Sequence, residues 1–443
     1  MNQTRSLAGR SPHVLIITFA YEPLAHVSPT RPSWMGRELT KLGWEVSVLT
    51  VDWSHPLPAA IPSIEESVAR ALDAQSPRML AIDGRLSDPA FDPLAIPRTT
   101  EPRVRNAAIR KLRTAWDAVG WGPYAGWARH AFRAARMLHQ RAPLDVTWAI
   151  HGDASTHAIA SALHATEGVP WVADYKDPWS LFHPPVLRPL VRWATARRLR
   201  TAAAMTETCA AQAELDAREF ARSPVVVYSG YDDEMMARSE PERPGPGFCV
   251  TYLGTLNPQH ETRLLADVFL ELGRRGVLDR ADVTLHQYAR PSDQLAQLLA
   301  PVGLDSIVRS HDWVSRARSF SLMRGSDVLL LFTSTRGTGT LKLGVKELEY
   351  FASGTPVLVL GEPLDELKPV IASCPQVAVA TREIEAADFL ETEACRCASG
   401  TSPSKTRMAP NAPVLEPFSW KRQAERLAAV LDGARSRRPG RES

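Results

Sequence analysis

Runs of apolar residues alternate with amphipathic stretches along most of this chain. The run His13–Ala20 is followed by Met35, Leu39 and Leu42 at helical spacing, and then by a second run, Glu45–Val51. A continuous apolar run is typical of a strand buried on both faces, whereas apolar residues three or four positions apart are typical of a helix with one buried face. The chain therefore opens with a predicted strand, helix and strand.

The same alternation continues through both halves of the chain. Further predicted strands are Asp145–Ile150, Pro170–Tyr175, the start of Val225–Asp233, Cys249–Gly254, Asp282–Tyr288, Asp327–Phe332 and Thr355–Leu360. The stretches between them predict helices, among them the alanine-rich 192–222, and the proline-rich residues 54–101 predict long loops. Alternating strands and helices predict an α/β protein with two doubly wound parallel sheets. Such sheets bind ligands at the carboxyl ends of their strands, which predicts a site in a cleft between the two halves.

A chain of 443 residues is longer than one hydrophobic core ordinarily serves, which predicts two domains. The clearest linker is the proline- and glycine-rich stretch 240–247. We therefore predict Rossmann-like domains at 12–235 and 248–415, a last helix at 416–434 and a disordered tail at 435–443.

The composition restricts the class of protein. A hydrophobic fraction of 44% with 23% charged residues is that of a soluble globular protein, and a net charge of +3 gives no reason to expect nucleic-acid binding. The five cysteines form no Cys-x-x-Cys pair, so we expect neither a zinc site nor a disulfide framework. The sequence has no signal-peptide pattern, and no apolar run approaches the ~18 residues that span a bilayer. These features predict a cytoplasmic protein.

Residues 103–141 are basic and carry two apolar sets at helical spacing: Ile109, Leu112 and Trp116, and then Trp127, Ala131, Ala134 and Leu138. Two interpretations stay open. The helices could lie on the inner face of the cell membrane as peripheral elements, or they could pack on a sheet with their basic faces in water. Amphipathic helices ordinarily cover a sheet, so we favour the interpretation in which these helices pack on one.

The stretch 327–360 is the part of the sequence that most clearly predicts a ligand-binding site. Its pattern predicts a strand, a polar loop with glycines, a helix that ends at Gly354, and a second strand. Loops that open a helix in such units bind phosphorylated ligands, because the first N–H groups of a helix are free. Lys346 lies in the first turn of this helix, where a cation opposes the helix dipole unless an anion binds beside it.

Lys346 and Glu349 share one helix face, and the pair has two interpretations. It could be a surface ion pair worth ~0.5 kcal/mol or less. It could instead hold one nucleotide, with Lys346 and loop amides on the diphosphate and Glu349 on the ribose hydroxyls.

Motifs of several other enzyme classes are absent. The sequence contains no P-loop, His-Glu-x-x-His, Gly-x-Ser-x-Gly or Asp-x-Asp motif, and Gly337-x-Gly339 lacks the third glycine of the dinucleotide fingerprint. We therefore expect neither a metal nor a cofactor.

The stretch from Lys346 to Leu360 resembles the K-x-x-EY-x-A-x-G-x-PV signature of glycosyltransferase family 4 and its relatives, which have the GT-B fold. Four further pieces, in the right order, are similar to elements of that family: Ala173–Trp179, Tyr228–Asp232, Tyr252–Thr255, and a terminal helix that contains Phe418–Trp420. The resemblance covers nearly the whole chain. It implies that the terminal helix crosses back to the N-terminal domain.

The resemblance implies transfer of a hexose-type sugar from a nucleotide-diphosphate sugar to an acceptor hydroxyl, with retention and without a metal, in polysaccharide or glycoconjugate synthesis. The acceptor would be a carbohydrate or lipid-linked. Glu349 would bind the ribose, and Lys346 would bind the diphosphate and stabilise it as it leaves. The other implied donor contacts are Gly254, Thr255, Arg263, Thr338, Gly339 and Thr340.

Three residues of the first half are candidates for the sugar or acceptor side. His151 directly follows a predicted strand, where it would contact the sugar or acceptor, or else fill the strand–helix junction. Asp174 and Asp177 would contact the acceptor, although Asp177-Pro178 is also a common turn sequence.

The chain also departs from the family pattern. Leu341 stands where members often carry a glutamate, and 26–31 replaces a frequent glycine pair. Lys176 and Ser229 replace the usual arginine and asparagine. A nucleotide-sugar epimerase of the same fold and a degenerate, non-catalytic GT-B subunit therefore stay open as alternatives.

Overall fold

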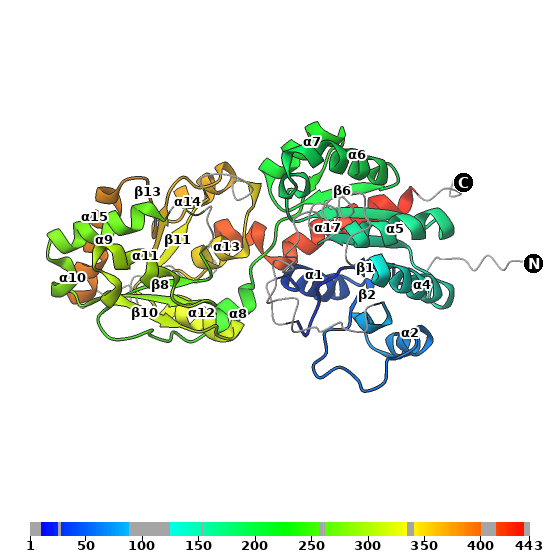
Figure 1. The fold of residues 1–443 in the computed structure, drawn as a ribbon, viewed down its shortest axis with the longest axis horizontal. Helices are drawn as coiled ribbons and strands as arrows, with labels where there is room; N and C mark the ends of the chain where they lie inside the picture. The colour runs from blue at the N-terminus through cyan, green and yellow to red at the C-terminus, as the bar shows by residue number, and fades with distance from the viewer. Residues whose placement is uncertain are drawn as a thin grey trace, which may run out of the picture. The chain divides into compact units, whose positions relative to one another are not determined.

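The computed structural model describes residues 10–24, 28–87, 125–152, 154–256, 260, 262–334, 341–399 and 413–437. The chain forms two compact units (Figure 1). The first contains Met1–Tyr228 and Gln423–Ser443, and the second contains Ser229–Arg422.

The stretch 240–247, expected to link the domains, belongs to the second unit. A hydrogen bond and an ion pair hold the stretch in that unit. The Glu242 amide donates to the Ser321 carbonyl at 2.9 Å, and the Arg243 side chain forms an ion pair with Asp327 at 2.9 Å. A proline-rich composition therefore did not mark the boundary, because these contacts come from residues far along the chain.

The first unit is built on a sheet of seven parallel strands in the order β3-β2-β1-β4-β5-β6-β7. The strands are β1 (His13–Ile17), β2 (Glu45–Val51), β3 (Arg78–Ile82), β4 (Val146–His151), β5 (Trp171–Tyr175), β6 (Ala204–Glu207) and β7 (Val225–Val226). β3 lies in the stretch 54–101, expected to form long loops, and β6 interrupts the alanine-rich stretch 192–222, expected to be helical. Both pair with a longer neighbouring strand, so tertiary pairing outweighs their weak local signals.

The helices of this unit are α1 (Thr30–Lys41), α2 (Ile64–Asp73), α4 (Ala125–Arg141), α5 (Ala154–Glu167), α6 (Arg188–Leu199) and α7 (Ala210–Phe220). α2, α4 and α5 share one apolar core with the sheet. Trp127, Ala131, Ala134 and Leu138 are all buried in that core, so the packing interpretation applies to α4. The other apolar set, 109–116, lies outside the described residues.

The second unit is built on six parallel strands in the order β10-β9-β8-β11-β12-β13. They are β8 (Phe248–Leu253), β9 (Val283–Tyr288), β10 (Val308–His311), β11 (Val328–Phe332), β12 (Val357–Leu360) and β13 (Val377–Ala380). The helices are α8 (Asp233–Arg238), α9 (Arg263–Arg274), α10 (Val277–Arg280), α11 (Gln294–Leu299), α12 (Arg316–Gly325), α13 (Val345–Ala352), α14 (Lys368–Ala372) and α15 (Glu383–Ala398). α9, α11 and α15 share one core with the strands.

The last helix, α17 (Trp420–Ser436), spans the division between the units. From Gln423 onward it belongs to the first unit, where the Arg435 guanidinium lies 5.8 Å from the centre of the Trp44 ring. In both sheets the strand order reverses beside the first strand, between β1 and β4 and between β8 and β11. Open α/β sheets bind ligands at the carboxyl ends of strands at such points.

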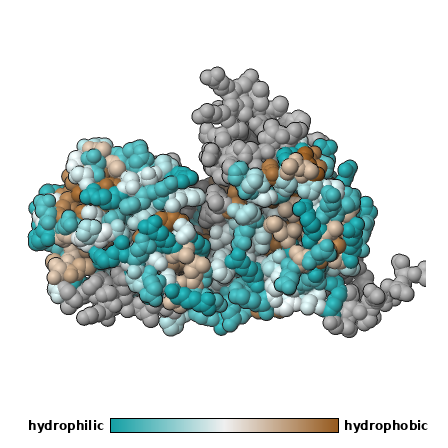
Figure 2. Space-filling model, turned by 90° about the horizontal axis from the view of Figure 1, so that it is seen from below, coloured by the Kyte–Doolittle hydropathy of each residue, from teal (hydrophilic) through white to brown (hydrophobic). Residues whose placement is uncertain are grey.

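The surface is mostly polar where it can be seen. Figure 2 shows one face of the molecule, on which hydrophilic residues predominate and hydrophobic ones gather in small groups. Among the described residues, no helix is both long enough and apolar enough to cross a membrane.

Candidate functional site

The second unit places two of the predicted donor residues, Gly254 and Lys346, at the reversal point of its sheet. β11 ends at Phe332, and α13 begins after Gly344, which occupies its N-cap. β8, the neighbouring strand, ends at Leu253 and is followed by Gly254. Thr338, Gly339 and Thr340 lie outside the described residues, so their predicted backbone contacts stay predictions.

Lys346 reaches from the first turn of α13 to the end of β8. Its Nζ donates to Tyr252 Oη at 3.2 Å and lies 4.3 Å from the centre of the same ring. Tyr252 Oη in turn donates to the Thr255 carbonyl at 3.2 Å. The structure therefore brings Lys346, Gly254 and Thr255 together, with Tyr252 as the residue that joins them.

Gly254 has a backbone conformation that only glycine adopts readily, with φ at +143°. A Cβ at this position would collide with Lys346 Nζ. Glycine is thus needed for the turn after β8, and its lack of a side chain leaves room for the lysine ammonium in this position. The sequence predicts the turn, but only the tertiary structure decides which side chain comes so close.

The electrostatic surroundings of Lys346 suit an anion. In the described part of the chain no carboxylate lies within ion-pair distance of its ammonium. His260 stacks on Phe332, with ring centres 6.0 Å apart, and burial together with the charge of Lys346 lowers its pKa to about 4. The imidazole is therefore neutral at pH 7, whereas Lys346 and the helix dipole supply positive charge at the N-terminus of α13.

Glu349 lies one turn further along α13, with 7% of its side chain exposed. It forms an ion pair with Arg316, at the first turn of α12, rather than with Lys346. Burial raises the pKa of Glu349, and Arg316 opposes that shift. Arg316 is a residue that sequence analysis missed, because nothing local in the sequence links positions 33 residues apart.

Asp232 belongs to the same charged group. Its Oδ1 accepts from the Met235 amide at 2.8 Å and so caps α8, whereas its buried Oδ2 has no hydrogen-bond partner in the described residues. Burial raises the pKa of Asp232, and the positive charge of Arg316 lowers it. Arg316 therefore compensates two buried carboxylates.

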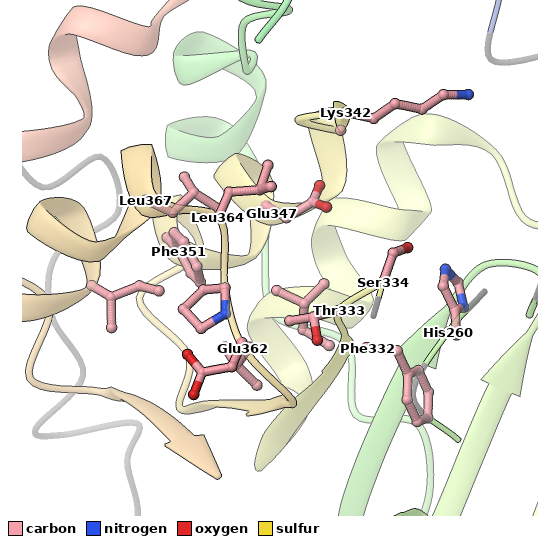
Figure 3. A pocket seen from close by; sticks show the side chains of 15 residues that line it. His260, Phe332, Thr333, Ser334, Lys342, Glu347, Phe351, Glu362, Leu364 and Leu367 are labelled. Atoms are coloured by element: carbon pink, nitrogen blue, oxygen red, sulfur yellow. The ribbon is translucent and has the colours of Figure 1, made fainter. Parts of the chain in front are cut away.

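A cavity of about 200 Å³ lies beside the first turn of α13. Figure 3 shows Thr333 and Ser334 after β11, Glu347 on α13 and Glu362 after β12 around it, with Lys342 extending away from them. Burial raises the pKa of Glu347, and its Oε2 has no partner in the described part of the chain. Hydroxyls and carboxylates of this kind suit hydrogen bonds to a polyhydroxylated ligand.

Arg263 stands apart from this group in the described contacts. It is exposed at the first residue of α9, and no described contact joins it to Lys346. Its diphosphate contact stays a prediction.

In the first unit, His151 is the last residue of β4 and is 6% exposed. Its ring stacks on Tyr175 with centres 4.8 Å apart and meets Trp179 at 4.5 Å. Burial, followed by the nearby His157, holds the pKa of His151 well below its ordinary value. His151 is thus a neutral histidine in an aromatic cluster at the carboxyl end of the sheet.

The two aspartates differ sharply. Asp174 is fully buried and accepts two hydrogen bonds from Arg31, at 2.7 and 3.0 Å, and one from Thr206 at 2.7 Å. An acceptor could reach this carboxylate only by displacing Arg31. Asp177 is partly exposed in the segment after β5. The predicted acceptor contacts of both stay predictions.

No protein-family model and no curated protein matches the sequence. Solved structures do match. Sucrose-phosphate synthase from Thermosynechococcus elongatus is 14% identical with a TM-score of 0.62, and the match covers 95% of this chain and 98% of that one. HepE from Anabaena, solved with UDP and glucose, is 12% identical with a TM-score of 0.56, covering 95% and 99%. A glycosyltransferase from Rickettsia africae is 10% identical with a TM-score of 0.57, covering 95% and 98%.

At these identities the likeness concerns the fold. The first and second units each reproduce a parallel α/β domain, and the matched proteins have the GT-B fold. The chain therefore has the GT-B fold, which is the fold class predicted from its sequence.

Proposed function

We propose that this protein is a glycosyltransferase that moves a sugar from a nucleotide-diphosphate sugar to an acceptor hydroxyl. The observation that carries the proposal is the position of Lys346. Its ammonium is held by Tyr252 beside Gly254, at a helix N-terminus and at the reversal point of a parallel sheet. HepE, one of the structural neighbours, has been solved with UDP-glucose, which supports a nucleotide-sugar donor.

The chemistry follows from where charge develops. As the bond between sugar and diphosphate breaks, negative charge builds up on the leaving diphosphate. Lys346 and the positive end of the α13 dipole stabilise that charge without a metal. Thr255, Arg263 and the backbone at 338–340 are further proposed donor contacts.

The ribose would lie over Glu349. Because Arg316 is already bound to this carboxylate, the two ribose hydroxyls share it with the guanidinium. The sugar would lie toward the cavity beside Glu347. His151, as a neutral imidazole, would accept or donate one hydrogen bond to the sugar or the acceptor, and Asp174 and Asp177 are proposed on the acceptor side.

We propose a retaining reaction in polysaccharide or glycoconjugate synthesis, at the cytoplasmic side of the cell membrane, with a carbohydrate or lipid-linked acceptor. The test is calorimetric titration with UDP and with GDP. We expect one of them to bind, and Lys346→Ala to weaken that binding at least roughly tenfold, because a charge-assisted hydrogen bond is lost. Lys421→Ala, an exposed lysine in the first turn of α17, is the matched control.

Unchanged binding by the Lys346 variant would refute the site assignment. Product analysis then separates the activities. Transfer requires an acceptor, whereas conversion of the donor sugar without one would identify an epimerase. Nucleotide binding without turnover of any donor would identify a non-catalytic subunit.

A further inference from the structure

One segment of the first unit combines positive charge with exposed apolar side chains. Residues 178–206 contain five arginines and no aspartate or glutamate: Arg188, Arg192, Arg197, Arg198 and Arg200. The segment follows β5 and forms the short 3₁₀ turns η3 (Trp179–Phe182) and η4 (Pro185–Leu187) and then α6. α6 lies at the upper edge of its unit in Figure 1.

Four large apolar side chains of this segment are exposed. Phe182 is 50%, Val186 83%, Leu190 37% and Trp193 58% exposed. Among the described residues, the other exposed large apolar side chains are spread over distant parts of the sequence: Leu42, Ile61, Met79, Trp313 and Ile384. Four within twelve residues therefore form a concentration rather than the usual scatter.

Leu190, Trp193 and Arg197 lie on one face of α6, with Val186 of η4 before the helix and Arg200 directly after its last residue. Val186, Leu190, Trp193, Arg197 and Arg200 follow one another at intervals of three and four residues, and all five are exposed. The opposite face is buried through Val191, Ala194 and Leu199. We call Phe182 together with these five exposed residues the α6 surface.

The charge of the α6 surface is available for binding. Arg197 stands 5.9 Å from the centre of the Trp193 ring, and it and Arg200 are both exposed near the end of the helix. Arg192, on the flank, is already paired with Glu219, and Arg188 donates to the His183 carbonyl at 3.2 Å. The apolar part is therefore followed by two exposed arginines on the same face.

We propose that the α6 surface docks on an anionic phospholipid bilayer. Charge complementarity favours an anionic bilayer, because residues 178–206 carry arginines and no carboxylate. Aromatic and aliphatic side chains flanked by arginines are the composition of helices that lie in the interface of a membrane, with apolar groups among the acyl chains and guanidinium groups at the phosphates.

The docking surface differs from residues 103–141, whose helix α4 turns its apolar face into the core. It also adjoins the predicted acceptor side, because Trp179 of η3 contacts His151. Docking itself does not depend on glycosyl transfer; only the inference that the acceptor is lipid-linked rests on the proposed function.

The test is co-sedimentation of the full chain with vesicles of phosphatidylcholine alone and of an equimolar phosphatidylcholine–phosphatidylglycerol mixture. We expect binding to the mixed vesicles only, and its loss as salt is raised from about 0.1 M to about 1 M, where the Debye length falls from about 10 to about 3 Å. Arg197→Gln with Arg200→Gln should weaken binding roughly 30-fold, about fivefold for each arginine.

The apolar part is tested separately. Leu190→Ser with Trp193→Ser should weaken binding at least roughly tenfold, because their insertion among acyl chains is lost. Ile61→Ser and Arg70→Gln are matched controls at exposed positions of the same unit and should bind as the unaltered chain does. Since every altered side chain is exposed, unchanged thermal denaturation checks that the variants fold.

Three outcomes would overturn the proposal. The unaltered chain would stay in the supernatant with both kinds of vesicle, or the α6 variants would bind as well as the controls. In the third, the chain would be a dimer without vesicles and Leu190→Ser with Trp193→Ser would make it a monomer, which would identify the α6 surface as a contact between copies.

Discussion

The ion pair of Arg316 and Glu349 can be tested without knowing the substrate. Arg316→Met keeps most of the aliphatic volume of the side chain and removes its charge. The Glu349 carboxylate then stays buried, with 7% of its side chain exposed, next to the buried Asp232. An uncompensated buried carboxylate destabilises the folded state, or it takes up a proton.

Removing one partner of a fully buried pair costs roughly 3–5 kcal/mol. Here 35% of the Arg316 side chain is exposed, so water already screens part of the interaction. We therefore expect a loss of about 2–3 kcal/mol in the free energy of unfolding of the second unit. For a unit of this size that corresponds to a fall of roughly 4–12 °C in its melting temperature.

The loss should depend on pH. In the variant the pKa of Glu349 in the folded state rises further above its unfolded value, because the guanidinium that opposed the effect of burial is gone. The folded state then binds more protons than the unfolded state between the two pKa values, so stability decreases as pH rises through that window. The difference from the unaltered chain should be largest at pH 8 and should shrink toward pH 5.

The assay is thermal and urea denaturation of Arg316→Met, Glu349→Gln and the double variant at both pH values. The double variant should be more stable than Arg316→Met alone, because the amide carries no charge to compensate. Arg318→Met, on the same helix but in an exposed pair with Glu242, is the matched control and should lose far less. A loss that is equal at pH 5 and pH 8, or that Glu349→Gln does not relieve, would refute the reasoning.

Three further predictions concern Tyr252 and His260 at the candidate site of the second unit and His151 in the first unit. Tyr252→Phe keeps the ring under Lys346 but removes the hydrogen bond to the ammonium. The affinity for UDP or GDP, measured by calorimetry, should fall roughly fivefold, as expected for the loss of one hydrogen bond. An unchanged affinity would mean that Tyr252 does not position the lysine. The His260 imidazole should titrate with a pKa of about 4 by NMR, and a midpoint near 6.5 would contradict this. The free energy of unfolding should fall as pH drops from 6.5 toward 4, because the unfolded chain binds a proton at this histidine and the folded chain does not. His151→Asn should leave nucleotide affinity unchanged and lower the transfer rate at least roughly tenfold, whereas equal rates would leave the histidine as a residue of the aromatic cluster.

Much of the fold could be predicted from local pattern. The apolar runs at 13–20 and 327–332 contain β1 and β11, and the helix after the polar loop is α13, with Lys346 in its first turn. These predictions worked because burial on both faces leaves a continuous apolar run and burial on one face leaves a helical period. β3 and β6 escaped prediction because their residues become strands only when a neighbouring strand pairs with them.

The sequence by itself determined the alternation of strands and helices, the GT-B fold class and the placing of a lysine at a helix N-terminus. Only the tertiary structure decided which charges meet: Arg31 with Asp174, 143 positions apart, and Arg316 with Glu349. It also decided that α4 turns its apolar face inward while α6 leaves part of its own exposed. The physical reason is the distance along the chain over which each signal acts. Periodicity is a local signal, and it reports whether a residue is buried. The partner of a charged or apolar side chain comes from a distant segment, which only folding brings close.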